Sequence, residues 1–436
     1  MTDPKTDPRT IPTTNPTTNP TTARTTPPFR ADHVGSFLRP NCLLDAREQF
    51  FVQKSITAEQ QLRAVEDQAI AEIVQFQQDV GLQSITDGEF RRTDFHIDFL
   101  AQLGGVKTDV PFTVLRPDGS EELAPPVIRV TDTVRHVRNT ERADFEYLKR
   151  QVAAGHTPKV TIPSPTMLHC RGGRAGISRE AYPELDPAFY DDSALAYGEE
   201  LQSLADAGCS CVQMDDTNLA YLCDEKMREA ARQRGDDPNE LPHRNAGFIN
   251  KVVALKPAGM TLAMHLWRGN FKSTHAAAGN CEPVAEPLLS EMNLDACFRA
   301  YDDARSGDFK PLRFLPKGKI VVLGLVTTKF GEMESKDMLK RRIDEAARYA
   351  PLDQLCLSPQ CGFSSAVHGN NIAVEAQRLP NRPSAARPWV FKHRPAPAPG
   401  GAGGDQRNVR ARPPAGTAGS SGRPIGRRPA PAPAAS

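Results

Sequence analysis

The feature that most constrains the fold of this chain is a short uncharged apolar run that ends abruptly in polar side chains. Residues 262–264 read Leu-Ala-Met, and several functional side chains follow them at once: His265, Trp267, Arg268 and Asn270. A buried parallel strand that ends in polar groups is the arrangement from which the open-ended active sites of α/β barrels are built. The alternative is a strand followed by an ordinary polar loop.

A second run ends in the same way and favours the functional interpretation. Residues 355–357 are strand-like and lead into a Gly/Ser-rich loop that contains Cys361. Because imidazole and thiolate groups are common zinc ligands, His265 and Cys361 at two strand ends predict a shared metal ion.

Strand-like and helix-like segments alternate through the middle of the chain. Strands are predicted at eight places: 31–36, 82–86, 159–162, 210–214, a run closed by His265, 296–301, 319–326 and 355–357. Helices are predicted at 58–80, 191–207, 222–233, 245–255, 283–292 and 335–350, where Gly81 and Gly208 end two of them and Ser335 caps the last. Pro and Asp-Gly turn signals predict an inserted hairpin region over residues 105–140.

This alternation predicts an α/β fold, a (β/α)8 TIM barrel with insertions. A doubly wound open sheet is the alternative, but no glycine-rich phosphate-binding sequence follows the first strand. In a barrel the carboxyl ends of all strands face one mouth. Side chains far apart in the sequence are therefore predicted to meet there: Ser36, Asp87, Glu89, Ser164, Asp215, His265 and Cys361.

The two ends of the chain differ in composition from the middle. Residues 1–29 are rich in Thr and Pro, and residues 371–436 are rich in Pro, Ala, Gly and Arg, with eleven basic and two acidic side chains. Neither segment can bury a core, so both are predicted to be disordered tails on one barrel domain at 30–370. The abrupt change after Asn370 suggests coding DNA read in a shifted frame.

Charge and cysteine usage exclude several classes of protein. A net charge of +1 gives no overall attraction to nucleic acid or to a membrane. No apolar run approaches the roughly 20 residues of a membrane-spanning helix. Nine cysteines are scattered and no signal peptide precedes them, which is typical of a reduced, cytoplasmic protein rather than of a disulfide framework.

Six motifs occur in an order that resembles the cobalamin-independent methionine synthase family: HVGSF, DGEFRR, VQMDD, HLWRGNF, GDFKPLRF and LSPQCGFSS. The match covers roughly residues 30–370 and is closest to shorter members with a single catalytic barrel. It implies a methyltransferase of methionine biosynthesis, which moves a methyl group from a methyltetrahydrofolate-like donor to a thiol amino acid such as homocysteine. It also implies a Zn²⁺ ion at the mouth that holds the thiol sulfur as a thiolate, because a free thiol with a pKa of about 8.5 is mostly protonated at pH 7. The oligomeric state stays open.

The resemblance implies how the substrate amino acid is held. Gly35 and Ser36 match the loop that binds its carboxylate through backbone N–H and hydroxyl groups. Glu89 and Asp215 match the acidic pair that binds its amino group, and two carboxylates suit an ammonium ion. The alternatives are an ordinary turn for the loop and structural salt bridges for the acidic pair, for example to Arg91.

For the metal, the resemblance implies His265 and Cys361 as the first and last zinc ligands, but two positions between them depart from the family. Trp267 stands where the family has Cys, and Ala300 stands where it has Glu. Neither side chain has a lone pair for a metal, and a tight zinc site needs three or four protein donors, so weak zinc binding is predicted. Three nearby residues are candidate substitutes: Cys297, Asp302 and Asp303. Lys329 stands where other members have a proton-donating His, which leaves acid catalysis unassigned.

The sequence leaves several functions open. The first is a methyltransferase with a rebuilt metal site, and the second is a barrel that binds an amino acid or a pterin without methyl transfer. The third is a barrel enzyme of the uroporphyrinogen decarboxylase and methylcobalamin methyltransferase type, which the glycine and cysteine motifs fit less well. A Schiff-base aldolase that uses Lys329 fits least.

Overall fold

The computed structural model describes residues 24–108, 113–115, 121–123, 127–169, 172–268, 277, 279–302, 306–332, 334–364, 369–370, 372 and 377, all within one unit of the chain, Met1–His393. Most of the two predicted tails, 1–29 and 371–436, therefore lies outside the described residues. Within the described part of the chain, no helix combines the length and the apolar character that crossing a membrane requires.

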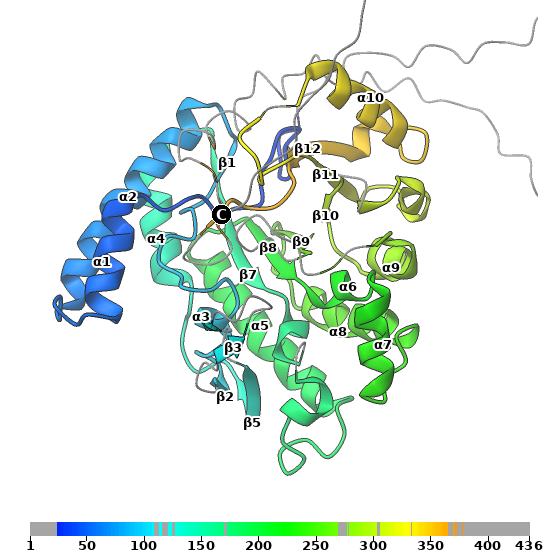
Figure 1. Cartoon of the computed structure of the whole chain (residues 1–436), viewed down its shortest axis with the longest axis horizontal. Coiled ribbons are helices and arrows are strands. Elements are labelled where there is room, and N and C mark those ends of the chain that lie inside the picture. The colour runs from blue at the N-terminus through cyan, green and yellow to red at the C-terminus, as the bar shows by residue number, and fades with distance from the viewer. Residues whose placement is uncertain are drawn as a thin grey trace, which may run out of the picture. The chain divides into compact units, whose positions relative to one another are not determined.

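A six-stranded, fully parallel sheet forms the centre of the fold (Figure 1). Each strand pairs with the next in the chain: β7 (Val160–Pro163), β8 (Cys211–Asp216), β9 (Thr261–Leu266), β10 (Ala296–Ala300), β11 (Ile320–Val326) and β12 (Leu355–Pro359). All six are predicted strands, and their side chains are almost entirely buried. Such burial is expected for parallel strands that are covered on both faces.

The remaining strand segments close this sheet into a barrel. β1 (Ser84–Ile85) pairs in parallel with β6 (Thr157–Pro158), which leads directly into β7. On the other side, Ala31 forms a single parallel bridge with Leu357 of β12. The first predicted strand, 31–36, is thus reduced to one bridge.

Residues 31–36 are joined to β1 and the residues after it by hydrogen bonds from side chains, and not by a ladder of backbone hydrogen bonds. His33 Nε2 lies 2.9 Å from the Ser84 carbonyl oxygen, and Thr86 Oγ1 donates to the Gly35 carbonyl over 2.6 Å. These groups are buried, so the backbone must find such partners in place of water. Eight segments therefore follow one another around the barrel in chain order, and the predicted (β/α)8 fold is confirmed.

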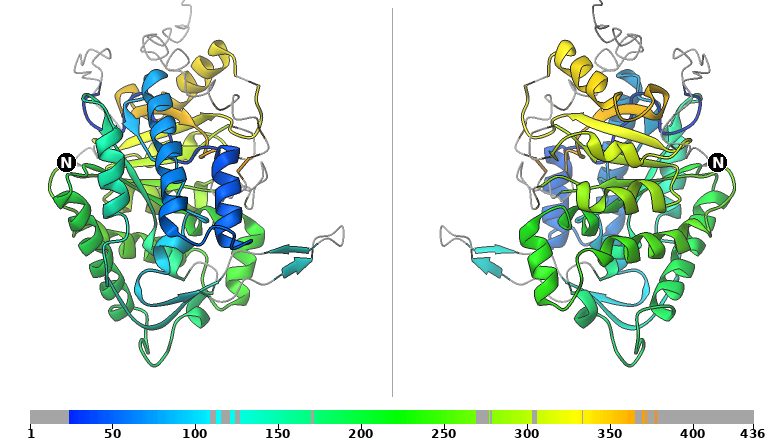
Figure 2. Two further views of the ribbon diagram at one scale, coloured as in Figure 1. Left: turned by 90° about the vertical axis from the view of Figure 1, so that its left-hand side faces the viewer. Right: turned by 90° about the vertical axis from the view of Figure 1, so that its right-hand side faces the viewer.

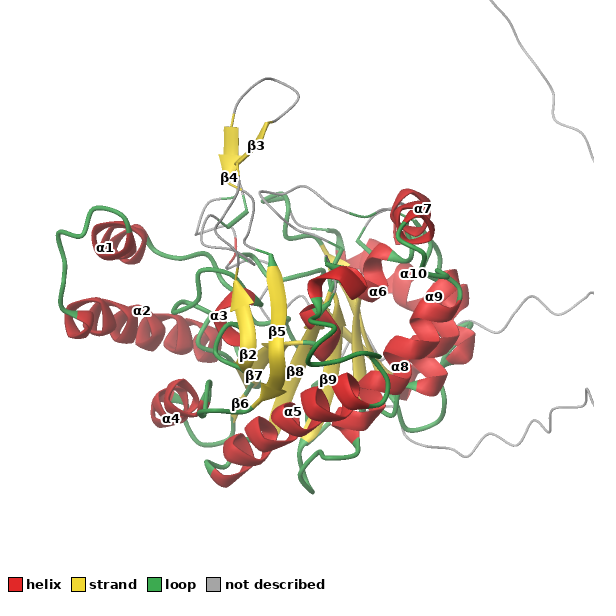
Figure 3. Cartoon of the chain, turned by 90° about the horizontal axis from the view of Figure 1, so that it is seen from below, coloured by secondary structure: helices red, strands yellow, loops and turns green. Residues whose placement is uncertain are grey.

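Helices lie outside the strands, as Figures 1 and 3 show. They are α1 (Asn41–Phe51), α2 (Glu59–Asp79), α3 (Ile97–Leu100), α4 (Arg142–Gln151), α5 (Ala188–Asp206), α6 (Asn218–Tyr221), α7 (Glu225–Gln233), α8 (Glu240–Val253), α9 (Glu282–Glu286) and α10 (Lys336–Ala346). A π-helical turn, Pro287–Glu291, continues α9. Short 3₁₀ turns occupy Pro165–Leu168, Gly173–Gly176, Lys310–Phe314 and Leu352–Gln354.

The helix ends follow the predicted signals. Ser335 Oγ accepts a hydrogen bond from Met338 N over 3.2 Å and caps α10. Gly81 and Gly208 follow α2 and α5 with φ of +81° and +92°, a left-handed conformation that glycine adopts most readily. Helix α1, which the sequence patterns did not predict, lies beside α2 (Figure 2).

The predicted insertion at 105–140 is a pair of antiparallel hairpins. β2 (Gly104–Thr108) pairs with β5 (Ile128–Arg135), and β3 (Thr113–Leu115) pairs with β4 (Glu121–Leu123). Polar side chains alternate with buried ones along β5, as expected for a strand with one face toward the core.

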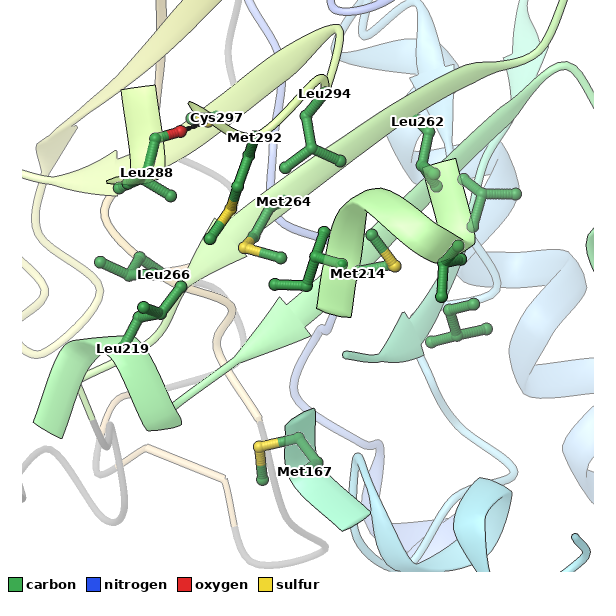
Figure 4. Packing of buried hydrophobic residues seen from close by; sticks show 14 of the residues in the cluster. Met167, Met214, Leu219, Leu262, Met264, Leu266, Leu288, Met292, Leu294 and Cys297 are labelled. Atoms are coloured by element: carbon green, nitrogen blue, oxygen red, sulfur yellow. Dashed lines mark hydrogen bonds between the residues drawn. The ribbon is translucent and has the colours of Figure 1, made fainter. Parts of the chain in front are cut away.

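Alternate side chains of the strands enter two separate cores. Leu262, Met264 and Leu266 of β9 belong to the large cluster between strands and helices, part of which Figure 4 shows. The opposite face contributes to a smaller cluster inside the barrel: Val34, Ala263, Ala296, Phe298, Ile320, Val322 and Cys356. His265 continues the inward series of β9 after Ala263, so its ring lies where the barrel interior meets the mouth.

Candidate active site

Two neighbouring strands, β8 and β9, hold the centre of the candidate site. Asp215 and His265 are paired positions of these strands, and His265 Nδ1 lies 3.3 Å from Asp215 Oδ1. Gln213 Nε2 donates to the same carboxylate oxygen over 2.7 Å. Both Asp215 and His265 are buried, and their charges interact strongly because little water screens them.

The surroundings of His265 favour its charged form. Burial lowers the pKa of the ring, but the interactions with the Asp215 carboxylate and the Cys361 sulfur outweigh burial and raise the pKa to about 10. Cys361 is itself buried and accepts a hydrogen bond from Gln360 Nε2 over 3.4 Å. The fold therefore brings the two predicted ligands, one imidazole and one thiol, into electrostatic contact.

Glu89 is the second carboxylate of the site, and its charged form is disfavoured. Burial raises its pKa; Arg92 opposes this shift and Asp215 adds to it, and the result is about 7. Thr161 Oγ1 donates to Glu89 Oε1 over 2.9 Å. The backbone of Glu89 is left-handed, with φ of +61°, a costly conformation for a residue with a side chain and one that is common at functional sites.

Two further residues predicted at the mouth support the carboxylates. Asp87 Oδ1 accepts a hydrogen bond from Glu89 N over 2.8 Å and holds the tight turn at that residue. Ser164 N donates to the Asp215 carbonyl over 2.8 Å and ties the end of β7 to β8. Both contacts are local consequences of strand ends that meet at one edge of the barrel.

Gly35 lies directly against the acidic residues. Its φ is +141°, and a Cβ atom there would lie 2.7 Å from Thr161 Cγ2 and 3.2 Å from Glu89 Oε1. Only glycine combines this backbone conformation with so close an approach. The Gly35 peptide therefore lies directly against Thr161 and Glu89, and its contact with a substrate carboxylate stays a prediction.

Ser36 contacts the loop that follows β12. Ser36 Oγ accepts a hydrogen bond from Ser364 N over 3.2 Å, and the Phe37 ring stacks on Phe363 with centroids 5.9 Å apart. A Cβ atom on Gly362 would lie 1.7 Å from Ser36 Oγ. The Ser36 hydroxyl thus orders the loop that carries Cys361, and its contact with a substrate carboxylate stays a prediction.

The two departures from the family pattern lie at the carboxyl ends of β9 and β10. Ala300 lies two positions after Phe298, on the inward face of β10, and offers only a methyl group. Trp267 N donates to the Asp216 carbonyl over 2.8 Å, and its indole packs edge-on against Phe95 at 4.7 Å. The indole Nε1 is buried without a hydrogen-bond partner among the described residues. An aromatic ring thus occupies the position of one family ligand.

The two predicted substitutes that the structure describes, Asp302 and Cys297, do not complete a metal site. Asp302 accepts hydrogen bonds from Lys329 Nζ over 2.9 Å and from Thr327 Oγ1 over 3.2 Å. Cys297 belongs to the cluster outside the barrel, and Asp303 lies outside the described residues. In the described part of the chain no three His, Cys, Asp or Glu side chains are grouped so that they could hold a metal ion. The residues present therefore do not fit the four-ligand zinc site that the family implies.

The sequence interpretation chose the wrong arginine as an alternative partner for the acidic pair. Arg91 forms ion pairs with Asp67 at 2.6 Å and with Asp144 at 3.0 Å, away from Glu89. The neighbouring Arg92 is the cation that acts on Glu89; it pairs with Glu141 at 3.0 Å and is buried. Adjacent arginines point in different directions, and the DGEFRR sequence gave no signal to choose between them.

The fold and the site define the class: an α/β-barrel protein with buried carboxylates, an imidazole and a thiol at the carboxyl ends of its strands. Comparison with known proteins is consistent with this class. Residues 29–235 match the family model described as the catalytic domain of cobalamin-independent synthase.

Individual relatives extend the match over most of the chain. The chain is 44% identical to the uncharacterized protein YxjH of Bacillus subtilis over 80% of its own length and 91% of that protein. A crystal structure described as a putative vitamin-B12 independent methionine synthase from Listeria monocytogenes is 36% identical, with a TM-score of 0.64, and the match covers 83% of this chain and 96% of that one. The chain also matches 41% of the length of a 5-methyltetrahydropteroyltriglutamate–homocysteine methyltransferase from Bacillus velezensis, at 22% identity over 78% of its own length. The protein belongs to the cobalamin-independent methionine synthase family.

Proposed function

We propose that this protein binds a homocysteine-like thiol amino acid at the barrel mouth and methylates its sulfur from a methyltetrahydrofolate-like donor, as a step of methionine biosynthesis. The observation that carries the proposal is the pair of buried carboxylates, Glu89 and Asp215. Burial and the charge of Asp215 raise the pKa of Glu89, and Arg92, which opposes this shift, forms its ion pair with Glu141. A substrate ammonium would favour the charged form of Glu89, because buried carboxylates need a cation or several donors.

Methyl transfer requires the substrate sulfur to attack the methyl carbon of the donor. The new S–C bond forms as the N–C bond of the donor breaks, and the electron pair stays on the donor nitrogen, which takes up a proton. In the family a zinc ion holds the sulfur as a thiolate. Since the residues at positions 267 and 300 do not fit that ion, the contribution of this chain is to orient the amino acid and to exclude water around its sulfur.

A second function, amino-acid binding without methyl transfer, is favoured by Trp267. Trp267 stands at the sequence position of a metal ligand, packs against Phe95, and leaves its buried indole Nε1 without a hydrogen-bond partner in the described part of the chain. An unpaired buried donor is costly unless a ligand completes it. A substrate group that accepts a hydrogen bond from Trp267 Nε1 would satisfy it.

Calorimetry and a turnover assay test both functions. L-Homocysteine and L-methionine are titrated into the purified protein, and methionine formation from homocysteine is followed by mass spectrometry with 5-methyltetrahydrofolate, its triglutamate or methylcobalamin as donor, each with and without added Zn²⁺. Binding with folate-dependent methionine formation supports the first function, and binding alone supports the second. Turnover with methylcobalamin alone would favour the uroporphyrinogen decarboxylase-like alternative. Absence of amino-acid binding would overturn both proposals.

The free cysteines are consistent with the predicted cytoplasmic location. Eight cysteines lie in the described part of the chain, and all are free thiols. Small-molecule substrates and a reducing compartment are therefore proposed together with the reaction.

A further inference from the structure

A second group of reactive side chains lies in the loops that follow β8 and β9, apart from the acidic pair. Cys223 stands between α6 and α7, and Cys281 directly precedes α9. The two sulfurs are 3.1 Å apart, and Cys223 donates its S–H to Cys281. Both side chains are buried and both are free thiols. A disulfide bond of about 2.05 Å would require the sulfurs to approach by only about 1 Å.

Positive charge surrounds one of these two sulfurs. Arg268 Nη2 lies 2.6 Å from Cys281 Sγ, and Arg268 Nη1 donates to the Gly279 carbonyl over 2.7 Å. The hydrogen bond from Cys223 and the charges of Arg299 and Arg268 lower the pKa of Cys281 well below its usual range, although burial opposes them. A thiolate held by a guanidinium and a thiol is a nucleophile at neutral pH.

The backbone holds the two loops together at this point. Gly279 has φ of +130°, and a Cβ atom there would lie 2.1 Å from the Cys223 carbonyl oxygen. No side chain larger than hydrogen fits, so the chain before Cys281 lies directly against Cys223. The closeness of the sulfurs is therefore built into the backbone and does not depend on side-chain rotation alone.

We propose that Cys223 and Cys281 are an oxidation site, in which Cys281 reacts with a hydroperoxide and Cys223 resolves the product to a reversible disulfide. The proposal is independent of the methyl-transfer function. It rests on the contact between the sulfurs, the guanidinium at 2.6 Å and the backbone constraint. At rest in a reducing compartment the pair is two thiols, and the disulfide forms under peroxide.

The reaction balances in two steps. The Cys281 thiolate attacks one oxygen of H₂O₂; the S–O bond forms, the O–O bond breaks, and the leaving hydroxide takes a proton to become water. The Cys223 sulfur then attacks the resulting sulfenic sulfur; the S–S bond forms, and the displaced hydroxide leaves as water with the Cys223 proton. Two thiols lose two electrons in total, and one peroxide is reduced to two waters.

Oxidation changes the partner of a residue next to the candidate active site. Arg268 directly follows Trp267, and disulfide formation removes the negative charge that Arg268 contacts. The environment of the Trp267 indole should therefore differ between the thiol and disulfide forms. Because the chain has one other tryptophan, Trp389, a Trp389→Phe background makes Trp267 the sole fluorophore.

The test treats the reduced full-length protein with H₂O₂, quenches with an alkylating reagent and maps peptides without reduction. We expect a Cys223–Cys281 cross-linked peptide to form at least tenfold faster than Cys209 is modified. Cys209 is the matched control, since it is also buried and free but burial raises its pKa to about 12. Dithiothreitol should reverse both the cross-link and the accompanying change in Trp267 fluorescence. Oxidised glutathione should react more slowly, because it cannot reach buried sulfurs as readily.

One variant separates the role of Cys281, which reacts with peroxide, from the role of Cys223, which resolves the product. In Cys223→Ser, H₂O₂ should produce a sulfenic acid on Cys281 that dimedone traps, with no cross-link and no reversible fluorescence change. If Cys281 in the parent is oxidised no faster than Cys209, or proceeds to sulfinic acid without a cross-link, the proposal is wrong. The peptide map of the parent decides the question even if the variant does not fold.

Discussion

Asp215 Oδ1 lies 3.3 Å from His265 Nδ1, at paired positions of β8 and β9 that are 50 residues apart in the chain. The family resemblance gave these residues separate tasks, one for a substrate amino group and one for a metal. In this barrel they form one unit, because the carboxylate that would bind an ammonium also holds the imidazole. Any change at one residue should therefore alter the other.

The first prediction concerns that coupling. Asp215→Asn should lower the pKa of His265 by about one unit or more, because it removes the charge of a hydrogen-bonded carboxylate. The stability that His265 contributes is fully present below its unfolded-state pKa of 6.5 and is lost as the pH rises toward 10, so this pH dependence should shrink in the variant. NMR titration of the His265 ring gives the pKa, with Asp132→Asn on the exposed side of β5 as control. An unchanged pKa would show that Cys361 alone sets it.

The second prediction tests amino-acid recognition. Glu89→Gln should weaken homocysteine or methionine binding by at least about tenfold, roughly 1.5 kcal/mol, since a charged hydrogen bond to the ammonium is lost. Calorimetry measures the dissociation constant, and Glu72→Gln on the exposed face of α2 is the matched control. Equal affinity in parent and variant would assign Glu89 a structural role.

The third prediction concerns stability and pH. The folded-state pKa of Glu89, about 7, lies above its ordinary value of 4.5, so the folded protein binds the extra proton between these values. Below pH 4.5 the carboxyl group is protonated in both the folded and the unfolded state, so its ionisation does not affect the free energy of unfolding. Between pH 4.5 and 7 ionisation lowers the free energy of unfolding by an amount that grows with pH, and above pH 7 the full destabilisation remains. The Tm of Glu89→Gln relative to the parent should therefore rise from about pH 5 to about pH 8. A constant or falling difference would contradict the assigned pKa shift.

The fourth prediction concerns zinc. The protein should be isolated with well under one equivalent, and Trp267→Cys combined with Ala300→Glu should raise zinc toward one per chain, because four donors act as one site. Each single change should raise the zinc content less than the double change does. Trp267→Phe, which adds no donor, is the control. Metal content after dialysis against a mild chelator is measured by mass spectrometry. One equivalent in the parent that His265→Ala abolishes would mean that other residues complete the shell.

The fifth prediction concerns the loop that carries Cys361. Gly362→Ala places a Cβ atom 1.7 Å from Ser36 Oγ and 3.0 Å from Ser36 Cβ, so it should lower the free energy of unfolding by about 2 kcal/mol. Gly247→Ala in α8 is the control; nothing lies within 4 Å of its Cβ atom, so helix propensity should make it neutral or stabilising. Urea denaturation measures both. If the two variants unfold alike, the contact between the loops is not tight.

The sequence by itself determined the order of the strands and the type of fold. Uncharged runs such as 320–326 can only be buried, and their alternation with amphipathic segments leaves a parallel barrel as the simplest arrangement. It also determined which groups stand at strand ends, because a strand end is local in sequence. His265 and Asp215 could therefore be placed at strand ends without coordinates, whereas the lack of a donor at positions 267 and 300 was implied only by the family resemblance.

Only the tertiary structure decided which of these groups interact. In the folded chain Arg92, and not Arg91, acts on Glu89. The Ser36 hydroxyl binds the loop after β12, and the Cys223 sulfur lies 3.1 Å from the Cys281 sulfur. None of these contacts has a signature in the chain, because each depends on side-chain direction and on loops that meet through packing. Burial then fixed the protonation of His265 and Glu89, since removing water makes each charge depend on neighbours that the sequence does not place.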